Sequence, residues 1–253
     1  MSAEVAAIVP AAGAGRRFGG TVSKPFALLD HRPLLVHTLT ALQESQAIRW
    51  VIPVVRAEEL AQVRALLARH RMTKVQPPCV GGSSRGASVA RGFAALPAGA
   101  RWVLVHDGVR PCVSQSLIGE AVRAAQRYGA VACGLPSSVT IKAVDERAEV
   151  RLTLDREQLW CVQTPQVFRR DWFAQALARA DHSLDHFPDD AALVESAGFR
   201  VRMIHGDPLN LKVTTPDDLV LAEAILARRD GRGEVKTQKA KVKTLAISGR
   251  GRF

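Results

Sequence analysis

The sequence predicts a Rossmann-like α/β fold, in which a mostly parallel β-sheet is flanked by helices. Short apolar, β-branched runs alternate along the chain with longer segments whose apolar residues recur at helical spacing. The chain has 253 residues, of which 47% are hydrophobic, and this length suits one α/β domain better than two. We therefore expect one domain at residues 1–229, followed by a basic tail at residues 230–253.

Each element follows from its local pattern. The predicted strands are short apolar runs, at Val5–Val9, Trp50–Val55, Lys74–Val75, Trp102–His106, Ala130–Leu135 and Phe199–His205. The predicted helices repeat their apolar residues every 3.6 positions, at Pro33–Gln43, Glu58–His70, Ser84–Leu96 and Ser114–Tyr128. A last helix should follow Thr215, which can serve as its N-cap, and end near Arg228. Pro216 suits the first turn and Asp218 the positive end of the helix dipole. Because helices cover a parallel sheet on both sides, both faces should be buried.

The segment from about residue 137 to 158 departs from this alternation. Two short strand-like runs, Thr140–Val144 and Val150–Leu154, enclose a charged turn. This pattern predicts a protruding β-hairpin arm. Since an isolated two-stranded hairpin is marginal in water, the arm should pack on another surface, for which a second subunit is a candidate.

The charge and the cysteines narrow the class of protein. The net charge is +11, but residues 228–253 alone hold nine of the 35 Lys and Arg side chains and only two of the 24 acidic ones. The basicity is therefore mainly a property of the tail. No apolar run approaches the ~20 residues of a membrane span, and Met1–Glu4 leads directly into the first strand, so we expect a cytoplasmic protein. The cysteines are widely separated and are expected to be reduced packing residues, at Cys79, Cys112, Cys133 and Cys161.

The loop after the first strand, residues 10 to 24, has the composition of a phosphate-binding loop. Its small residues allow the backbone to approach a ligand, and successive N–H groups in such a turn form an anion site. Arg17 and Lys24 add positive charge. Phe18 stands where a dinucleotide-binding fingerprint needs its third glycine, and Pro25 after Lys24 excludes a P-loop. A glycine-rich surface turn is the structural alternative.

Three further polar groups follow or precede predicted elements. Asp107 and Arg110 come after a strand, at the sheet edge where open α/β folds bind ligands. A carboxylate there can hold Mg²⁺, directly or through water, and an arginine can fork onto a phosphate. The Gly-Ser loop at residues 81–88 could read a nucleobase or simply cap a helix through Ser83 or Ser84. Lys212 could reach the same edge as a point charge, or be a solvated lysine.

Taken together, the motifs resemble those of the 2-C-methyl-D-erythritol 4-phosphate cytidylyltransferases of the non-mevalonate isoprenoid pathway, over about residues 5–228. The resemblance rests on Pro10-Ala11-Ala12-Gly13-x-Gly15-x-Arg17 with Lys24, Gly81-Gly82 with Arg85 and Ser88, Val105-His106-Asp107-x-x-Arg110-Pro111, Thr140-x-Lys142, Asp155-Arg156, Gln163-Thr164-Pro165-Gln166 and Asn210-x-Lys212-Val213-Thr214. The first motif is shared by many nucleotidyltransferases. The order and spacing of the others are specific to this family.

The resemblance implies a nucleotidyltransferase-type fold, a Mg²⁺-dependent reaction between CTP and methylerythritol phosphate, and a homodimer with exchanged arms. It assigns catalysis to Arg17, Lys24 and Lys212. It assigns CTP binding to Pro10, Ala11, Ala12, Gly13, Gly15, Gly82, Ser83, Ser88 and Gly108. It assigns the methylerythritol phosphate pocket to Asp107, Arg110, Thr140, Arg156, Thr164 and Lys212, with Thr140 and Arg156 serving the neighbouring subunit, and it leaves Asp107 as a candidate metal ligand.

Two alternatives remain. A cytidylyltransferase for another polyol phosphate, such as ribitol 5-phosphate, would keep the N-terminal loop and change only the second pocket. A nucleic-acid-binding protein would act through the basic tail, with an affinity that falls steeply with salt. The whole chain has one Tyr and eight scattered Phe, so its body lacks the aromatic platform of a single-strand binder.

Overall fold

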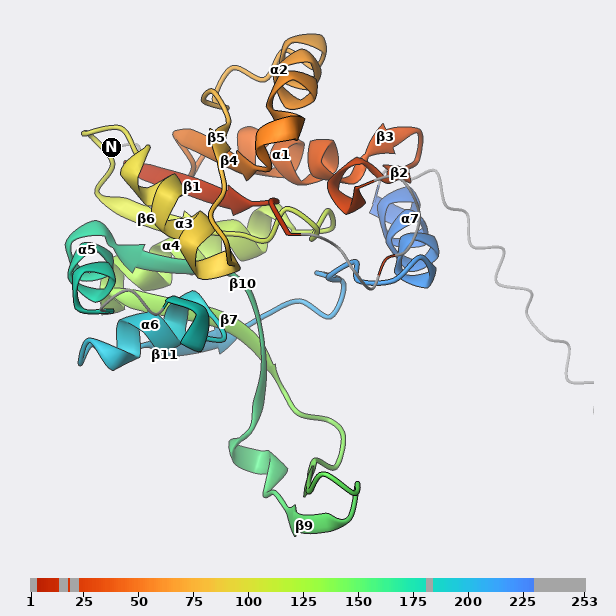
Figure 1. Ribbon diagram of the computed structural model, residues 1–253, viewed down its shortest axis with the longest axis vertical. Helices are drawn as coiled ribbons and strands as arrows, with labels where there is room; N and C mark the ends of the chain where they lie inside the picture. The colour runs from red at the N-terminus through yellow and green to blue at the C-terminus, as the bar shows by residue number, and fades with distance from the viewer. Residues whose placement is uncertain (1–3, 14–17, 19–22, 181–183, 230–253) are drawn as a thin grey trace, which may run out of the picture.

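A seven-stranded, mostly parallel β-sheet forms the centre of the protein (Figure 1). The computed structural model describes residues 4–13, 18, 23–180 and 184–229. The strands lie in the order β11-β7-β10-β6-β1-β4-β5. Their bounds are β1 Val5–Pro10, β4 Trp50–Val55, β5 Cys79–Val80, β6 Trp102–Val105, β7 Ala130–Pro136, β10 Trp160–Arg169 and β11 Arg202–His205. The predicted α/β class is therefore confirmed.

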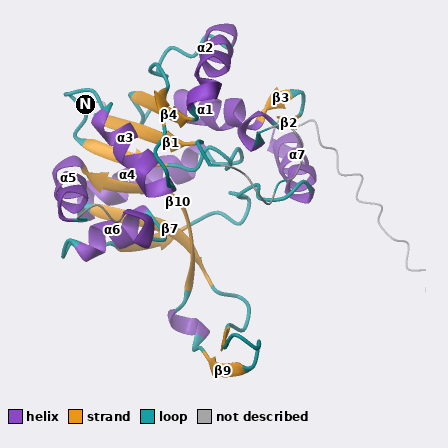
Figure 2. Ribbon diagram, viewed as in Figure 1, coloured by secondary structure: helices purple, strands orange, loops and turns teal. Residues whose placement is uncertain are grey.

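Helices cover both faces of this sheet (Figure 2). One face carries α1 (Leu34–Glu44), α2 (Leu60–Arg69) and α4 (Gln115–Tyr128). The other face carries α3 (Arg85–Ala94), α5 (Arg170–Arg179) and α6 (Asp190–Ser196). The last helix, α7 (Asp217–Arg229), packs beside the short hairpin of β2 (Leu28–Leu29) and β3 (Arg32–Pro33). Single 3₁₀ turns complete the fold, at η1 Lys24–Phe26, η2 Ala57–Glu59, η3 Arg156–Gln158 and η4 Leu184–His186.

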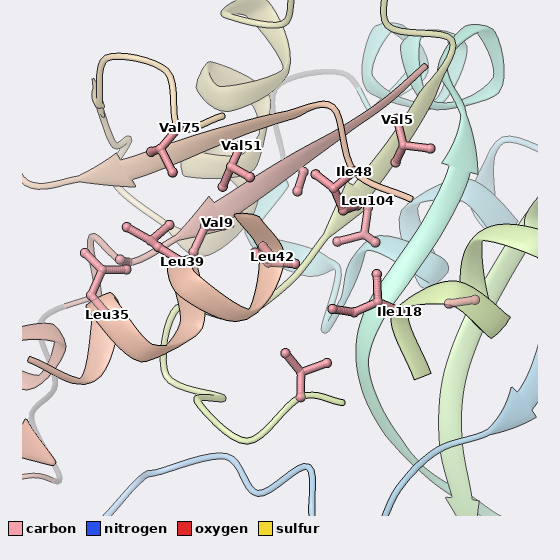
Figure 3. Close-up of a cluster of buried hydrophobic side chains, with 14 of the residues drawn as sticks. Val5, Val9, Leu35, Leu39, Leu42, Ile48, Val51, Val75, Leu104 and Ile118 are labelled. Atoms are coloured by element: carbon pink, nitrogen blue, oxygen red, sulfur yellow. The ribbon is translucent and has the colours of Figure 1, made fainter. Parts of the chain in front are cut away.

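The core divides at the sheet, as expected for strands buried on both sides. Val5 and Val9 of β1 point into one apolar cluster, whereas Ala6 and Ile8 point into the other. This alternation is the two-residue period of a strand with two covered faces. Figure 3 shows the first cluster, in which the side chains of α1 lie against β1 and β4.

The edge and the middle of the sheet depart from the prediction. Lys74–Val75 is not a strand, because Val75 makes only an isolated bridge to Val51, and the edge strand is β5. β10 was not predicted at all. It runs antiparallel between β6 and β7 and shifts register between Gln163 and Gln166. A proline inside this polar run lowers its strand signal.

The predicted arm is present as a hairpin of β8 (Lys142–Val144) and β9 (Val150–Thr153). β7 and β10 continue beyond the body of the sheet and carry the hairpin away from it (Figure 1). The side chains of Val144, Val150 and Leu152 are more than half exposed, at 52%, 58% and 56%. The arm therefore presents apolar surface that the body of the same chain does not cover.

The Asp218 carboxylate orders the segment just before α7. The Asp218 carboxylate accepts hydrogen bonds from the backbone N–H groups of Thr214 and Thr215 and from the Thr214 hydroxyl, at 2.7–2.8 Å. Although burial acts in the opposite direction, these bonds lower the pKa of Asp218 to about 2. Asp218 thus takes the part of the acidic residue in a capping box, which reaches back to the backbone before the helix, and the predicted N-cap role of Thr215 stays a prediction.

Candidate active site

A cavity of about 360 Å³ opens at the carboxyl ends of β1 and β6, a volume within the range of small-ligand sites. Its lining joins four segments that are far apart in the sequence: the loop after β1, the loop before α3, the loop after β6 and the loop before α7. The lining residues are Pro10, Ala11, Ala12, Gly13, Lys24, Pro25, Gly82, Ser83, Ser84, Arg85, Ser88, Asp107, Val109 and Lys212.

Parallel strands explain why these segments meet. β1 pairs with β6 in parallel register, so the residues that follow both strands reach the same edge. The Ala11 N–H donates to Val54 O at 2.7 Å, and the Gly108 N–H donates to Pro10 O at 3.2 Å. The backbone after each strand is therefore fixed before it turns around the cavity.

The glycines of the second loop permit a close approach. A Cβ at Gly81 would collide with Ala12 and Ser88, and a Cβ at Gly82 would lie 2.5 Å from the Cβ of Ala87. Both contacts are too short for a real side chain. Glycine is therefore needed at both positions, where the backbone of this loop packs closely on Ala12, Ala87 and Ser88 beside the cavity.

The hydroxyls of this loop are used within the protein. Ser84 is the N-cap of α3 and accepts from the Ala87 N–H at 3.1 Å, which confirms the capping alternative. Ser88 accepts from the Gly82 N–H at 3.1 Å and donates to Ser84 O at 2.8 Å. Ser88 therefore stabilises the turn that forms the cavity wall. Its predicted contact with a base stays a prediction.

Asp107 is the centre of the charged part of the site. Its Oδ2 atom lies 3.0 Å from Lys212 Nζ and 3.3 Å from Arg110 Nε, and its Oδ1 atom lies 3.3 Å from Arg85 Nε. Burial opposes ionisation, yet the charges of Arg85, Lys212 and Arg110 hold the pKa of Asp107 well below its usual range. Asp107 is thus an anion surrounded by three cations.

The three cations differ in their access to the cavity. The Lys212 side chain is 41% exposed and the Arg85 side chain 32%, and both residues line the cavity. The Arg110 side chain is only 9% exposed, and its Nη1 donates to Asn210 O at 2.9 Å. Lys212 is therefore the most accessible of the three charges, and the predicted fork of Arg110 onto a phosphate stays a prediction.

Lys24 is a further cation of the cavity lining, beside Arg85 and Lys212. It begins η1 after Ser23, and its Nζ donates to Val213 O at 3.0 Å. Val213 in turn donates its N–H to Val109 O at 2.9 Å. These bonds connect the loop after β1 with the loops that carry Asp107 and Lys212. Lys24 and Lys212 therefore lie in connected parts of the cavity wall.

A buried hydrogen-bonded chain supports the backbone at Asp107. The Asp107 N–H donates to Thr164 Oγ1 at 3.0 Å, so the Thr164 hydroxyl is free to donate to His106 Nδ1, 3.1 Å away. His106 Nε2 then carries the hydrogen that is donated to Arg110 O at 3.2 Å. Burial lowers the pKa of His106 to about 4, so the ring is neutral in this chain of bonds. Thr164 is 4% exposed and lies under the cavity wall rather than in the lining.

The remaining predicted site residues fall elsewhere. Gly108 lies behind the lining, against Ala11 and Leu35. Thr140 and Arg156 are exposed on the arm and do not line the cavity of their own chain. Gly15 and Arg17 lie outside the described residues, so their roles stay predictions. Sequence reasoning missed the bond from Arg85 to Asp190, 2.8 Å long, because the two residues are 105 positions apart and share no pattern.

The donor set fits a metal ion that arrives with phosphates. Within the described part of the chain, no group of three or more His, Cys, Asp or Glu side chains could hold a metal ion. Asp107 is ionised and lines the cavity. Mg²⁺ commonly takes one or two carboxylates, waters and substrate phosphates, so Asp107 suits a shared rather than a complete protein site.

The fold and the site together define a nucleotidyltransferase, with a glycine-rich loop and cationic side chains around one cavity. The family model for 2-C-methyl-D-erythritol 4-phosphate cytidylyltransferase matches residues 5–228. The chain belongs to this family.

Individual relatives agree with this assignment. The 2-C-methyl-D-erythritol 4-phosphate cytidylyltransferase of Syntrophus aciditrophicus is 38% identical over 233 residues, which cover 92% of this chain and 100% of the relative. That of Pelotomaculum thermopropionicum is 40% identical over 230 residues, covering 90% and 97%. The crystal structure of the Thermus thermophilus cytidylyltransferase is 34% identical with a TM-score of 0.70, covering 90% of this chain and all of the other. The Anaerococcus prevotii 4-diphosphocytidyl-2C-methyl-D-erythritol synthase has a TM-score of 0.77 at 28% identity, covering 88% and 98%.

Proposed function

We propose that the protein transfers the cytidylyl group of CTP to 2-C-methyl-D-erythritol 4-phosphate, releasing pyrophosphate. The observation that carries this proposal is that one cavity is lined by the loop after β1 together with Lys24, Lys212 and Asp107. Family membership supplies the two substrates. No comparison favours ribitol phosphate or a nucleic acid as the partner.

The chemistry requires two anions to meet. A phosphate oxygen of the acceptor attacks the α-phosphorus of CTP, a new P–O bond forms, and the bond to the pyrophosphate leaving group breaks. The acceptor phosphate is already ionised at neutral pH, so no general base is needed. Cations at fixed positions offset the repulsion and stabilise the charge that develops at phosphorus.

Lys24 and Lys212 have the charge and the position for this role. Both line the cavity, and their ammonium groups are bound by Val213 O and by Asp107, 3.0 Å away in each case. Arg17 is proposed for the same work from the sequence. Bound Mg²⁺ would add positive charge on the phosphates, and Asp107 would hold it directly or through water.

Pyrophosphate release tests the substrates. CTP with methylerythritol phosphate should give product, whereas CTP with ribitol 5-phosphate should give little. Lys24→Ala should lower kcat by roughly 10²–10³, the scale for one preorganised transition-state donor. Lys74→Ala is the matched control, because Lys74 also donates to a backbone carbonyl, Ser45 O at 2.7 Å, away from the cavity. Turnover with ribitol phosphate alone, or a folded Lys24→Ala protein with near-normal kcat, contradicts the proposal.

We further propose a homodimer in which each arm reaches the neighbouring subunit. The exposed apolar side chains of the hairpin support this, since burying each would contribute roughly 1.5–3 kcal/mol. Thr140 and Arg156 would then complete the partner's acceptor pocket. Sedimentation should give twice the chain mass, and Leu152→Asp should shift the protein to a monomer. A monomeric wild-type protein would refute the arrangement.

We also propose that the protein acts in the cytoplasm. All four cysteines are free thiols, which suits a reducing compartment. No helix in the described residues is long and apolar enough to cross a membrane.

A further inference from the structure

A buried carboxylate behind the cavity holds one of its cations. Asp190 is the first residue of α6 and is only 2% exposed. Its Oδ2 accepts from Arg85 Nη2 at 2.8 Å, while Nε of the same guanidinium donates to Asp107 at 3.3 Å. Arg85 therefore bridges two carboxylates, one in the cavity wall and one behind it. Asp190 itself does not line the cavity.

The position of Asp190 is fixed by the strand beside it. The neighbouring Asp189 is the N-cap of α6 and accepts from the Ala192 N–H at 2.8 Å. Gln166 of β10 donates to Asp189 at 2.9 Å and accepts from the Ala191 N–H at 2.9 Å. These bonds fasten the start of α6 to the centre of the sheet, so the Asp190 carboxylate is a rigid anchor for Arg85.

The Asp190 carboxylate limits the competition among Arg85, Arg110 and Lys212 for the Asp107 carboxylate. One carboxylate here serves three cations, and Lys212 shares the Oδ2 atom with Arg110. Without Asp190, Arg85 would keep Asp107 as its remaining anionic partner. A guanidinium prefers to bind a carboxylate through two parallel bonds, and the second bond would fall on the oxygen that holds Lys212.

We propose that Asp190 is a positioning residue for the transfer reaction: it holds Arg85 on the Oδ1 side of Asp107 and thereby keeps the Lys212 ammonium in place at the cavity. The inference rests on the proposed function of Lys212. It assigns no substrate contact to Asp190.

Kinetics of Asp190→Asn test the inference, with Glu195→Gln as the matched control. Both changes replace an acidic side chain of α6 by its amide, but only the first weakens the hold on Arg85, because Glu195 is exposed near the other end of the helix. Asp190→Asn should lower kcat/KM for the acceptor about tenfold, a fraction of the effect of deleting a catalytic cation, with the KM for CTP unchanged. Glu195→Gln should stay within about twofold, because Glu195 is exposed and does not line the cavity.

A double variant identifies the route of the effect. If Asp190 acts through Arg85, Arg85→Gln with Asp190→Asn should be no slower than Arg85→Gln alone, since coupled residues are not additive. Thermal unfolding of every variant reports loss of stability separately. Equal losses in Asp190→Asn and Glu195→Gln, additive effects in the double variant, or an unchanged kcat/KM in Asp190→Asn would each overturn the inference.

A labelling measurement without substrates tests the role of Asp190 independently of the proposed enzymatic activity. Acetic anhydride labelling of the whole protein, read by mass spectrometry, should modify Lys212 several-fold faster in Asp190→Asn than in wild type, with Lys142 on the arm as the internal reference. Unchanged Lys212 labelling refutes the positioning role even if the wild-type protein transfers cytidylyl groups. Wild-type protein that fails to turn over CTP refutes the proposed function instead.

Discussion

Replacement of His106 by glutamine should flatten the dependence of stability on pH. His106 is fully buried and lies in the hydrogen-bonded chain below Asp107. Burial lowers its pKa from 6.5 to about 4. Between these values the unfolded chain binds a proton at His106 that the folded protein does not bind. The free energy of unfolding therefore falls as the pH is lowered through this window.

The size of the effect follows from the shift. One unit of pKa corresponds to about 1.4 kcal/mol, so the wild-type protein should lose about 3 kcal/mol through this residue between about pH 7 and pH 4. His106→Gln lacks the titrating ring and should lose that much less over the same range. The variant will be less stable at neutral pH, because it breaks the bonds to Thr164 and Arg110.

Urea unfolding at several pH values, followed by circular dichroism, measures the difference. His186→Gln is the control, because His186 is exposed in η4 and makes no comparable buried chain. Its pH dependence should match that of the wild type. Parallel curves for wild type and His106→Gln would show that the buried ring titrates normally, and the neutral hydrogen-bonded chain would then be wrong.

Four further changes test the packing of two glycines, the segment before α7 and the basic tail. Gly92→Ala should destabilise the fold by about 1–3 kcal/mol, because its Cβ would lie 2.5 Å from Ile8 Cγ2 in the core. Gly119→Ala should stabilise the fold by up to about 1 kcal/mol, because its Cβ would meet only the flexible end of Arg123. Equal melting temperatures for the two variants would refute both predictions. Asp218→Ala should cost about 1 kcal/mol through loss of the hydrogen bonds from Thr214 and Thr215, and an unchanged denaturation midpoint would show that these bonds do not stabilise the fold. Deletion of residues 230–253 should leave pyrophosphate release intact, and a collapse of activity would show that the tail takes part.

The sequence predicts those parts of the protein that depend on local pattern. The apolar run at Val5–Val9 and the helical spacing of Ser114–Tyr128 each report a buried face, and the structure has β1 and α4 there. The convergence of Lys24 and Asp107 was also predictable, since residues after parallel strands share one edge. Family motifs narrowed the substrates further than composition could.

The parts that were missed depend on long-range contacts. β10 is polar at Gln163 and Thr164 because these side chains hydrogen-bond to neighbouring loops, so its apolar alternation is interrupted. α6 has only seven residues, too few for a clear helical period. Asp189 before an apolar run was a usable N-cap signal for it. No local signal could have paired Asp190 with Arg85.

The cations around Asp107 differ in how firmly the protein holds them. Arg110 is 9% exposed and donates to both Asp107 and Asn210, whereas Lys212 is 41% exposed and has a flexible stem. An incoming phosphate can therefore exchange partners with Lys212 at less cost than with Arg110, because fewer protein bonds break. On the proposed role of Lys212, Asp107 would hold this ammonium at the cavity in the free protein and release it toward the substrate.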